Sequence, residues 1–149
     1  MINLTIRPAP VAMRAIREDK EITKIVYNYF CDHYRSQPQG FEEFKKFNTR
    51  MKQAPNTKLV KFGNIVFLLK LDDDGIEFHS MGKETSVFAY IKDLHQLVDY
   101  VKQLNVPALY SYSNDSMFEI IFRRIRLNST QELKVAPDGN TYNYYRLEF

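Results

Sequence analysis

Apolar positions change their spacing along the chain, and this spacing predicts an alternation of strands and helices. Every second residue from Ile2 to Ile6 is apolar, which predicts a short opening strand that stops at Pro8. From about Glu21 to Arg35 the apolar residues recur at steps of three and four, as on one face of a helix. The same spacing from about Phe41 to Lys52 predicts a second helix, and Ser36–Gly40 reads as the break between them.

The middle of the chain predicts three strands followed by the longest helix. Thr57–Lys61 and Ile65–Leu71 read as strands, the second apolar almost throughout, as expected for a strand buried on both faces. Asp72–Gly75 predicts a hairpin turn, and Ile76–Met81 the returning strand. Val87–Leu104 carries a helical apolar stripe.

The last third of the chain predicts a strand, a helix and a closing hairpin. Pro107–Tyr112 reads as a short strand and Ser116–Arg126 as a helix capped by the preceding polar residues. Gln131–Val135 and Tyr142–Phe149 read as strands joined at the turn Pro137–Asn140. The predicted order is β-α-α-β-β-β-α-β-α-β-β, an α+β domain with a mixed sheet, part of it parallel across a right-handed crossover.

Composition fits one globular domain over residues 1–149, with 44% apolar and 26% charged residues. Ten Tyr and eleven Phe predict an aromatic core with tyrosines left over for the surface, where they suit an interface. The net charge of +3 does not demand nucleic acid. Basic clusters at Lys45–Lys52 and Arg123–Arg126 make nucleic-acid binding possible, but no known nucleic-acid motif accompanies them, so it is not favoured.

Several classes of chemistry are not expected from this sequence. Cys31 is the only cysteine, so an intrachain disulfide is excluded. His33, His79 and His95 are too scattered to predict a metal site. No apolar stretch approaches the length of about eighteen residues that a membrane span needs, and residues 1–10 lack the pattern of a signal peptide. We therefore expect an intracellular setting, with no membrane span.

The order of elements resembles the GNAT (Gcn5-related N-acetyltransferase) fold along nearly the whole chain. Leu4–Ala9 is similar to the opening strand of many such proteins, and Ile65–Leu71 with Ile76–Met81 to their central strands. Val87–Leu104 resembles the helix that follows the cofactor loop, and Pro107–Tyr112 with the next helix resembles the second half of the cofactor cleft. The resemblance implies a central mixed sheet with helices on both faces.

The sequence departs from this family where the cofactor binds. The family signature Gln/Arg-x-x-Gly-x-Gly/Ala holds a pyrophosphate on backbone N–H groups, but His79–Val87 has one glycine, Gly82, and no Gly-x-Gly/Ala. Glu84 would place a negative charge near that anion. In the later motif, read from Asp115, Arg126 stands where the family has glycine. These departures argue against ordinary acetyl-CoA binding, and we expect no cofactor.

The preferred hypothesis is a non-catalytic structural or interaction protein that acts through protein–protein contacts. Phe78–Met81, Lys92–Leu104 and Tyr110–Ser113 resemble segments of small proteins of tailed bacteriophages, some carried inside or on the virion. The resemblance implies a virion or assembly component whose partners are other proteins of the particle. It implies a location in the virion or in the host cytoplasm.

The alternative hypothesis is an acyl-CoA-dependent N-acetyltransferase with an atypical loop, which would use acetyl-CoA. The resemblance then implies that Glu77 deprotonates the amine and that Tyr112 or Tyr144 protonates the leaving thiolate. Strand alternation leaves open that Glu77 faces solvent instead. The residues expected to hold the pyrophosphate are Gly82, Lys83, Thr85, Ser86 and Val87.

Overall fold

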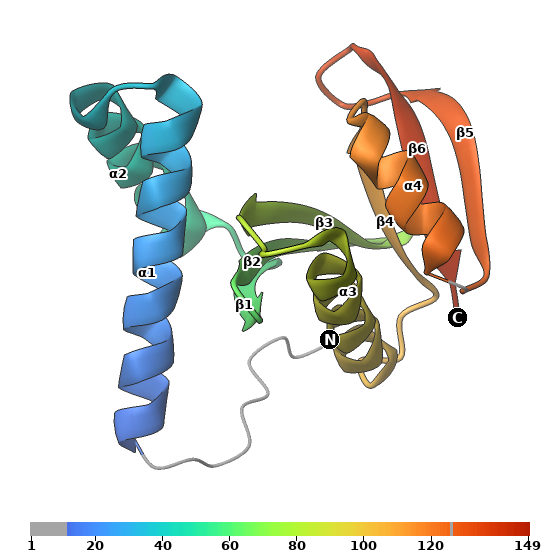
Figure 1. Ribbon diagram of the computed structural model, residues 1–149, viewed down its shortest axis with the longest axis horizontal. Coiled ribbons are helices and arrows are strands. Elements are labelled where there is room, and N and C mark those ends of the chain that lie inside the picture. Colours follow the sequence, from blue (N-terminus) through green and yellow to red (C-terminus); the bar gives the residue numbers. More distant parts are fainter. Residues whose placement is uncertain (1–11, 126) are drawn as a thin grey trace.

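A six-stranded mixed sheet with helices on both faces organises the chain (Figure 1). The structure, a computed structural model, describes residues 12–125 and 127–149, and of residues 12–18 the backbone only. The predicted opening strand Ile2–Ile6 lies outside the described residues. The elements are α1 (Ala12–Tyr34), α2 (Gln37–Gln53), β1 (Thr57–Phe62), β2 (Ile65–Asp72), β3 (Gly75–Gly82), α3 (Val87–Lys102), β4 (Ala108–Ser113), α4 (Ser116–Arg124), β5 (Ser129–Val135) and β6 (Thr141–Glu148).

The first two helices are longer than the sequence pattern predicted. Helix α1 begins at Ala12 rather than near Glu21, because the intervening residues are mostly good helix formers although they show no clear apolar stripe. The predicted break between the two helices is confirmed but is shorter than Ser36–Gly40, because α1 ends at Tyr34 and α2 already begins at Gln37. Ser36 is the N-cap of α2, where its hydroxyl accepts a hydrogen bond from the Gln39 backbone N–H, and Pro38 is tolerated in the first helical turn.

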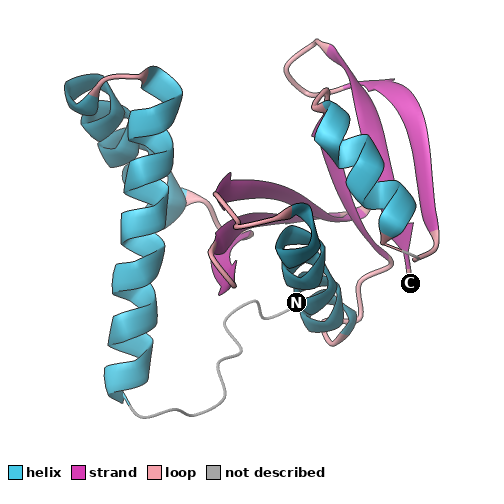
Figure 2. Ribbon diagram, viewed as in Figure 1, coloured by secondary structure: helices cyan, strands magenta, loops and turns pink. Residues whose placement is uncertain are grey.

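The strand order is β1-β2-β3-β4-β6-β5, in which only the β3–β4 pair is parallel. This confirms the predicted mixed sheet, whose one parallel pair is joined by the crossover helix α3. Figure 2 shows the strands in one layer, with α3 and α4 on the opposite side from α1 and α2. Within the described residues no helix has the length and apolar character that crossing a membrane requires.

Strand alternation divides the core into two clusters. On one face Ile76 and Phe78 of β3, Leu109 of β4 and Tyr145 of β6 pack beneath α3 and α4 with exposed fractions of 1% or less. On the other face Val66 and Met81 pack beneath α1 and α2, with the buried side chains Val26, Phe44 and Phe47. Helices α1 and α2 therefore cover the β1–β3 half of the sheet, and α3 and α4 cover the opposite face.

Candidate functional site

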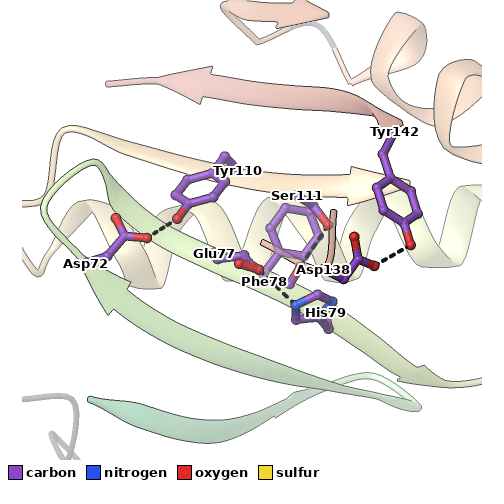
Figure 3. A network of polar contacts seen from close by, with 8 residues as sticks. All are labelled: Asp72, Glu77, Phe78, His79, Tyr110, Ser111, Asp138 and Tyr142. Carbon is purple, nitrogen blue, oxygen red and sulfur yellow. Dashed lines mark hydrogen bonds and ion pairs between the residues drawn. The ribbon is translucent and has the colours of Figure 1, made fainter. Parts of the chain in front are cut away.

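The parallel strands β3 and β4 pair at their beginnings and then separate. Their register contains only the pairs Ile76 with Leu109 and Glu77 with Tyr110. One step further the Ser111 hydroxyl donates a hydrogen bond of 2.8 Å to the Phe78 backbone carbonyl, in place of a backbone bond (Figure 3). The remaining lengths of both strands leave a gap between them, and this gap is the candidate site.

A cleft of about 610 Å³ opens where the two strands separate. Its walls come from the ends of β3 and β4, the first turns of α3 and α4, and Tyr29 of α1. Phe78 packs in the core and Met81 packs under α1, so neither side chain lines this cleft, whereas Tyr112 does. The other lining residues are Ile65, His79, Ser80, Gly82, Glu84, Ser86, Val87, Tyr90, Ser111, Ser113, Asp115, Met117, Phe118 and Ile121.

Aromatic rings and short hydroxyl side chains form much of the cleft wall. The Tyr90 hydroxyl on α3 lies 2.5 Å from the Ser80 hydroxyl on β3, so this pair ties the helix to the strand beyond the point of separation. Burial raises the pKa of Tyr90 to about 12, so the phenol stays neutral. The Phe118 ring on α4 packs against the rings of Tyr90 and Phe78. These contacts hold the two walls apart at a defined spacing.

The charge of the cleft is negative. Glu84 and Asp115 contribute carboxylates, and none of the described lining residues is Lys or Arg. Asp115 is the N-cap of α4, where its carboxylate accepts a hydrogen bond of 2.9 Å from the Met117 backbone N–H. Lys83, which the sequence suggested as a cofactor ligand, lies outside this cleft in an ion pair of 3.6 Å with Asp32 of α1.

Glu84 is held at the entrance to α3 by a set of hydrogen bonds. Its carboxylate accepts 3.0 Å bonds from the backbone N–H and the side-chain amide of Asn64, and a 3.2 Å bond from the Thr85 backbone N–H. A hydrogen bond from Asp93 and these backbone bonds lower the pKa of Glu84 to about 2, so the group is ionised at neutral pH. The charge that the sequence placed near the cofactor loop is therefore fixed there.

The first turn of α3 also differs from an anion cradle. Ser86 caps the helix and accepts a hydrogen bond of 3.1 Å from the Ala89 backbone N–H. The same turn carries Phe88, which is 72% exposed and lies 5.8 Å beneath the Arg124 guanidinium of α4 rather than in the cleft lining. The Ala89 N–H is already bonded to Ser86 and is therefore not available to an anion.

The residues around the cleft do not fit the pyrophosphate of a coenzyme A cofactor. Such a group needs positive charge or free N–H donors, and the described wall offers two carboxylates and no cationic side chain of Lys or Arg. The Thr85 N–H, which could bind an anion, already donates to Glu84. Of the five predicted pyrophosphate ligands, Gly82, Ser86 and Val87 line the cleft, whereas Lys83 and Thr85 do not.

The three predicted catalytic residues share the sheet face opposite α3 and α4. The Glu77 carboxylate lies within hydrogen-bond distance, 3.0 Å, of the His79 Nε2 atom, and its side chain is 14% exposed (Figure 3). The rings of Tyr112 and Tyr144 have centroids 5.2 Å apart. Burial, then Tyr144 and Glu77, raises the pKa of Tyr112. The structure brings these groups to one face, but only Tyr112 also reaches the cleft.

These residues belong to a larger tyrosine face on β4 and β6. It has four rings, Tyr110, Tyr112, Tyr142 and Tyr144, and each ring packs against at least one of the others. The Tyr110 hydroxyl donates to Asp72, and the Tyr142 hydroxyl donates a bond of 2.7 Å to Asp138 (Figure 3). None of the described helices packs on this face of β4 and β6. In Figure 1, α1 and α2 lie beside β1, β2 and β3 and do not reach β4 and β6.

Some site residues were not identified from the sequence. Ser111 and Tyr90 define the separation of the strands, and Asp93 of α3 carries the partner carboxyl of Glu84. For Asp93 a signal existed, because an acidic residue interrupts the buried stripe of α3. For Ser111 and Tyr90 no signal distinguished them from other serines and tyrosines. Among the described residues no group of His, Cys, Asp and Glu side chains is arranged to hold a metal ion.

The sequence matches no protein-family model and no curated protein. A solved structure with a similar fold is the crystal structure of the PaiA N-acetyltransferase from Thermoplasma acidophilum in complex with coenzyme A. The two structures superpose with a TM-score of 0.57 over 90% of this chain and 94% of that chain, at 9% sequence identity. A likeness at this identity shows the fold alone. It confirms the GNAT-like fold that the order of elements predicted.

Proposed function

We propose that this GNAT-fold chain is an interaction protein that binds other proteins, and that its cleft does not serve acetyl-CoA. The observation that carries the proposal is the charge of the cleft. The described lining has two carboxylates and neither Lys nor Arg, although a GNAT cofactor would bring a pyrophosphate there. Glu84 is ionised at neutral pH and occupies a backbone N–H group at the helix entrance.

Electrostatics make this arrangement unfavourable for a polyanion. Like charges within a few ångströms repel, and repulsion is stronger in a partly buried cleft than in water. The fold therefore keeps the separated strands of an acetyltransferase while the residues at the entrance oppose its cofactor.

The tyrosine face is the surface we assign to partner binding. Tyr112 and Tyr142 are half-buried, and their rings combine a large apolar area with a polar tip, as residues at protein interfaces commonly do. The Arg146 guanidinium donates a hydrogen bond of 3.1 Å to the Tyr144 hydroxyl, and Lys134 lies 4.1 Å from the Tyr144 ring centroid. That the partner belongs to a viral particle is a hypothesis that rests on the sequence resemblance alone.

The contact surface is tested by comparing two variants in a quantitative pull-down with cross-linking. The double variant Y112A/Y142A removes the two half-buried rings, and we expect it to lose most of the captured partner, since aromatic anchors dominate interface energies. The matched control is Phe41→Ala on α2, which removes an exposed ring 45% accessible at a distance from this face. Equal loss in both variants, or capture unchanged in Y112A/Y142A, would exclude the tyrosine face.

The second candidate function is N-acyl transfer. The specific observation in its favour is that the cleft is open and lies beside the Glu77–His79 pair. It is tested by measuring release of free coenzyme A from acetyl-CoA with a panel of amines. The proposed function predicts that free coenzyme A is released no faster than in a control without protein. Turnover that falls in Glu77→Gln but not in Asp99→Asn would establish catalysis, whereas turnover unchanged in Glu77→Gln would remove Glu77 from the mechanism.

A further inference from the structure

Strand β5 is an exposed edge of the sheet. It is the last strand in the order, and among the described strands it pairs only with β6. Six of its seven residues are exposed, whereas every residue of the opposite edge strand β1 is half-buried next to α1 and α3. Figure 1 shows β5 along the outer side of the molecule. Its outward backbone N–H and C=O groups are a template for a further strand.

The two faces of β5 carry different side chains. Leu133 and Val135 pair with residues of β6, and this pairing places their side chains on the face of the sheet that α4 covers. The two side chains nevertheless remain 72% and 66% exposed. On the other face Glu132 and Lys134 form an ion pair of 3.3 Å with side chains that are 59% and 45% exposed. The strand therefore offers an apolar face and a charged face whose two charges are opposite in sign.

We propose that two copies of this chain pair antiparallel through β5, with the two-fold axis at Leu133. Such a pair continues the sheet across the axis and keeps each side chain on its own face. In this register Leu133 lies opposite Leu133 of the second copy, and Val135 lies opposite Gln131. Glu132 lies opposite Lys134 of the second copy, twice by symmetry. The apolar side chains are covered and the charges are matched across the interface.

The neighbouring registers lack this complementarity. An axis at Glu132 places two glutamates opposite each other, and an axis at Lys134 places two lysines opposite each other. An axis at Gln131 leaves both charges opposite neutral residues. Because like charges directly opposite on adjacent strands are destabilising, the axis at Leu133 is favoured. No residue of the cleft takes part in this pairing, but Lys134 also contacts the Tyr144 ring of the tyrosine face.

Charge reversal with restoration tests this register. Sedimentation equilibrium of the wild-type protein over a concentration series is expected to show a reversible association from 17.7 kDa to twice that mass. The single variants Glu132→Lys and Lys134→Glu each place like charges opposite in both symmetric pairs, and we expect dimer dissociation constants raised about tenfold or more. The double variant E132K/K134E exchanges the charges and is expected to restore the wild-type value.

A second pair of variants distinguishes dimerisation through β5 from non-specific association through exposed apolar side chains. Leu133→Asp and Phe88→Asp each change a side chain that is 72% exposed, but only the first lies on β5. We expect Leu133→Asp to be monomeric and Phe88→Asp to dimerise like the wild type, with unchanged far-UV circular dichroism in both. A wild-type protein that stays monomeric at high micromolar concentration, or a double charge variant as weak as the single variants, would overturn the proposal.

Discussion

Asp93 and Glu84 are carboxyl groups that share a confined space beside Gly63. An added Cβ at Gly63, where φ is +58°, would collide with the Asp93 carboxylate and lie 2.5 Å from Glu84 Oε2, so this space accepts only glycine. Asp93 is 3% exposed, and its Oδ2 atom has no hydrogen-bond partner within the described part of the chain. Burial and the neighbouring Glu84 raise the pKa of Asp93 to about 7, while Lys92 and Lys61 partly offset this effect.

This pair predicts a loss of stability as the pH rises. The folded-state pKa of Asp93 lies above its ordinary value of 3.8, so the protonated group favours the folded state. That stabilisation is fully present below the ordinary pKa and is lost as the pH rises through about 7. The opposite shift of Glu84, to about 2, contributes stability that is retained throughout this range. The melting temperature is therefore expected to fall as the pH rises from about 4 to about 7, and melts at about pH 5.5 and about pH 8 measure part of this fall.

Asp93→Asn tests the assignment, because asparagine keeps the shape and cannot ionise. We expect the variant to lose most of the pH dependence and to gain about 1 kcal/mol relative to wild type at about pH 8. Asp99→Asn on the exposed side of α3 is the control and should keep the wild-type slope. Thermal melts at both pH values provide the measurement. A wild-type slope in Asp93→Asn would assign the titration to another group.

At the scale of the elements, the α1–α2 hairpin depends on one close approach. Gly40 in the first turns of α2 is buried against the backbone of Cys31 on α1. A Cβ added at Gly40 would lie 2.6 Å from the Cys31 Cα atom and 2.8 Å from its backbone nitrogen. Backbone atoms cannot turn aside as a flexible side chain can, so the two helices would have to move apart.

Gly40→Ala is therefore expected to destabilise the protein by roughly 1–3 kcal/mol. Intrinsic helix propensity alone favours alanine by about 1 kcal/mol and predicts the opposite sign. The urea midpoint of Gly40→Ala, compared with that of Gln39→Ala at the adjacent exposed position, measures the difference. A Gly40→Ala protein as stable as the wild type would show that the helices separate at no cost.

Element types followed from the sequence more fully than element ends. Periodic apolar positions gave the described strands and helices because alternation and helical spacing are local properties. The start of α2 was missed because Pro38 reads as a break in sequence but fits the first turn once Ser36 caps the helix. The start of α1 was missed because its first residues lack an apolar stripe, although their helix propensity is high.

The candidate site could be predicted only in part, because its shape depends on contacts between distant segments. The missing glycines and the charge of Glu84 were visible in the sequence, and both bear on cofactor binding. The separation of β3 from β4 and the position of Lys83 beside Asp32 depend on tertiary packing. The tyrosine face also needed the sheet order, since β4 and β6 become neighbours only when β6 inserts between β4 and β5.

At the scale of the whole molecule, the fold and the cleft suggest different functions. The mixed sheet with its helices on both faces matches the fold of a GNAT N-acetyltransferase, and its strands β3 and β4 separate into a cleft. The negative cleft disfavours a polyanionic cofactor, and the half-buried rings of Tyr112 and Tyr142 belong to the surface that we propose for protein binding. We therefore propose that this GNAT-like fold binds other proteins through its surface and does not bind acetyl-CoA in its cleft.

Isothermal titration of the wild-type protein with acetyl-CoA tests this claim most directly. The negative cleft predicts no detectable heat of binding up to millimolar ligand, at low and at physiological salt. Salt screens electrostatic repulsion, so a signal that emerges only at high salt would still agree with the charge argument. A dissociation constant in the micromolar range, on the order of −8 kcal/mol, would contradict the account and identify the cleft as a working cofactor site.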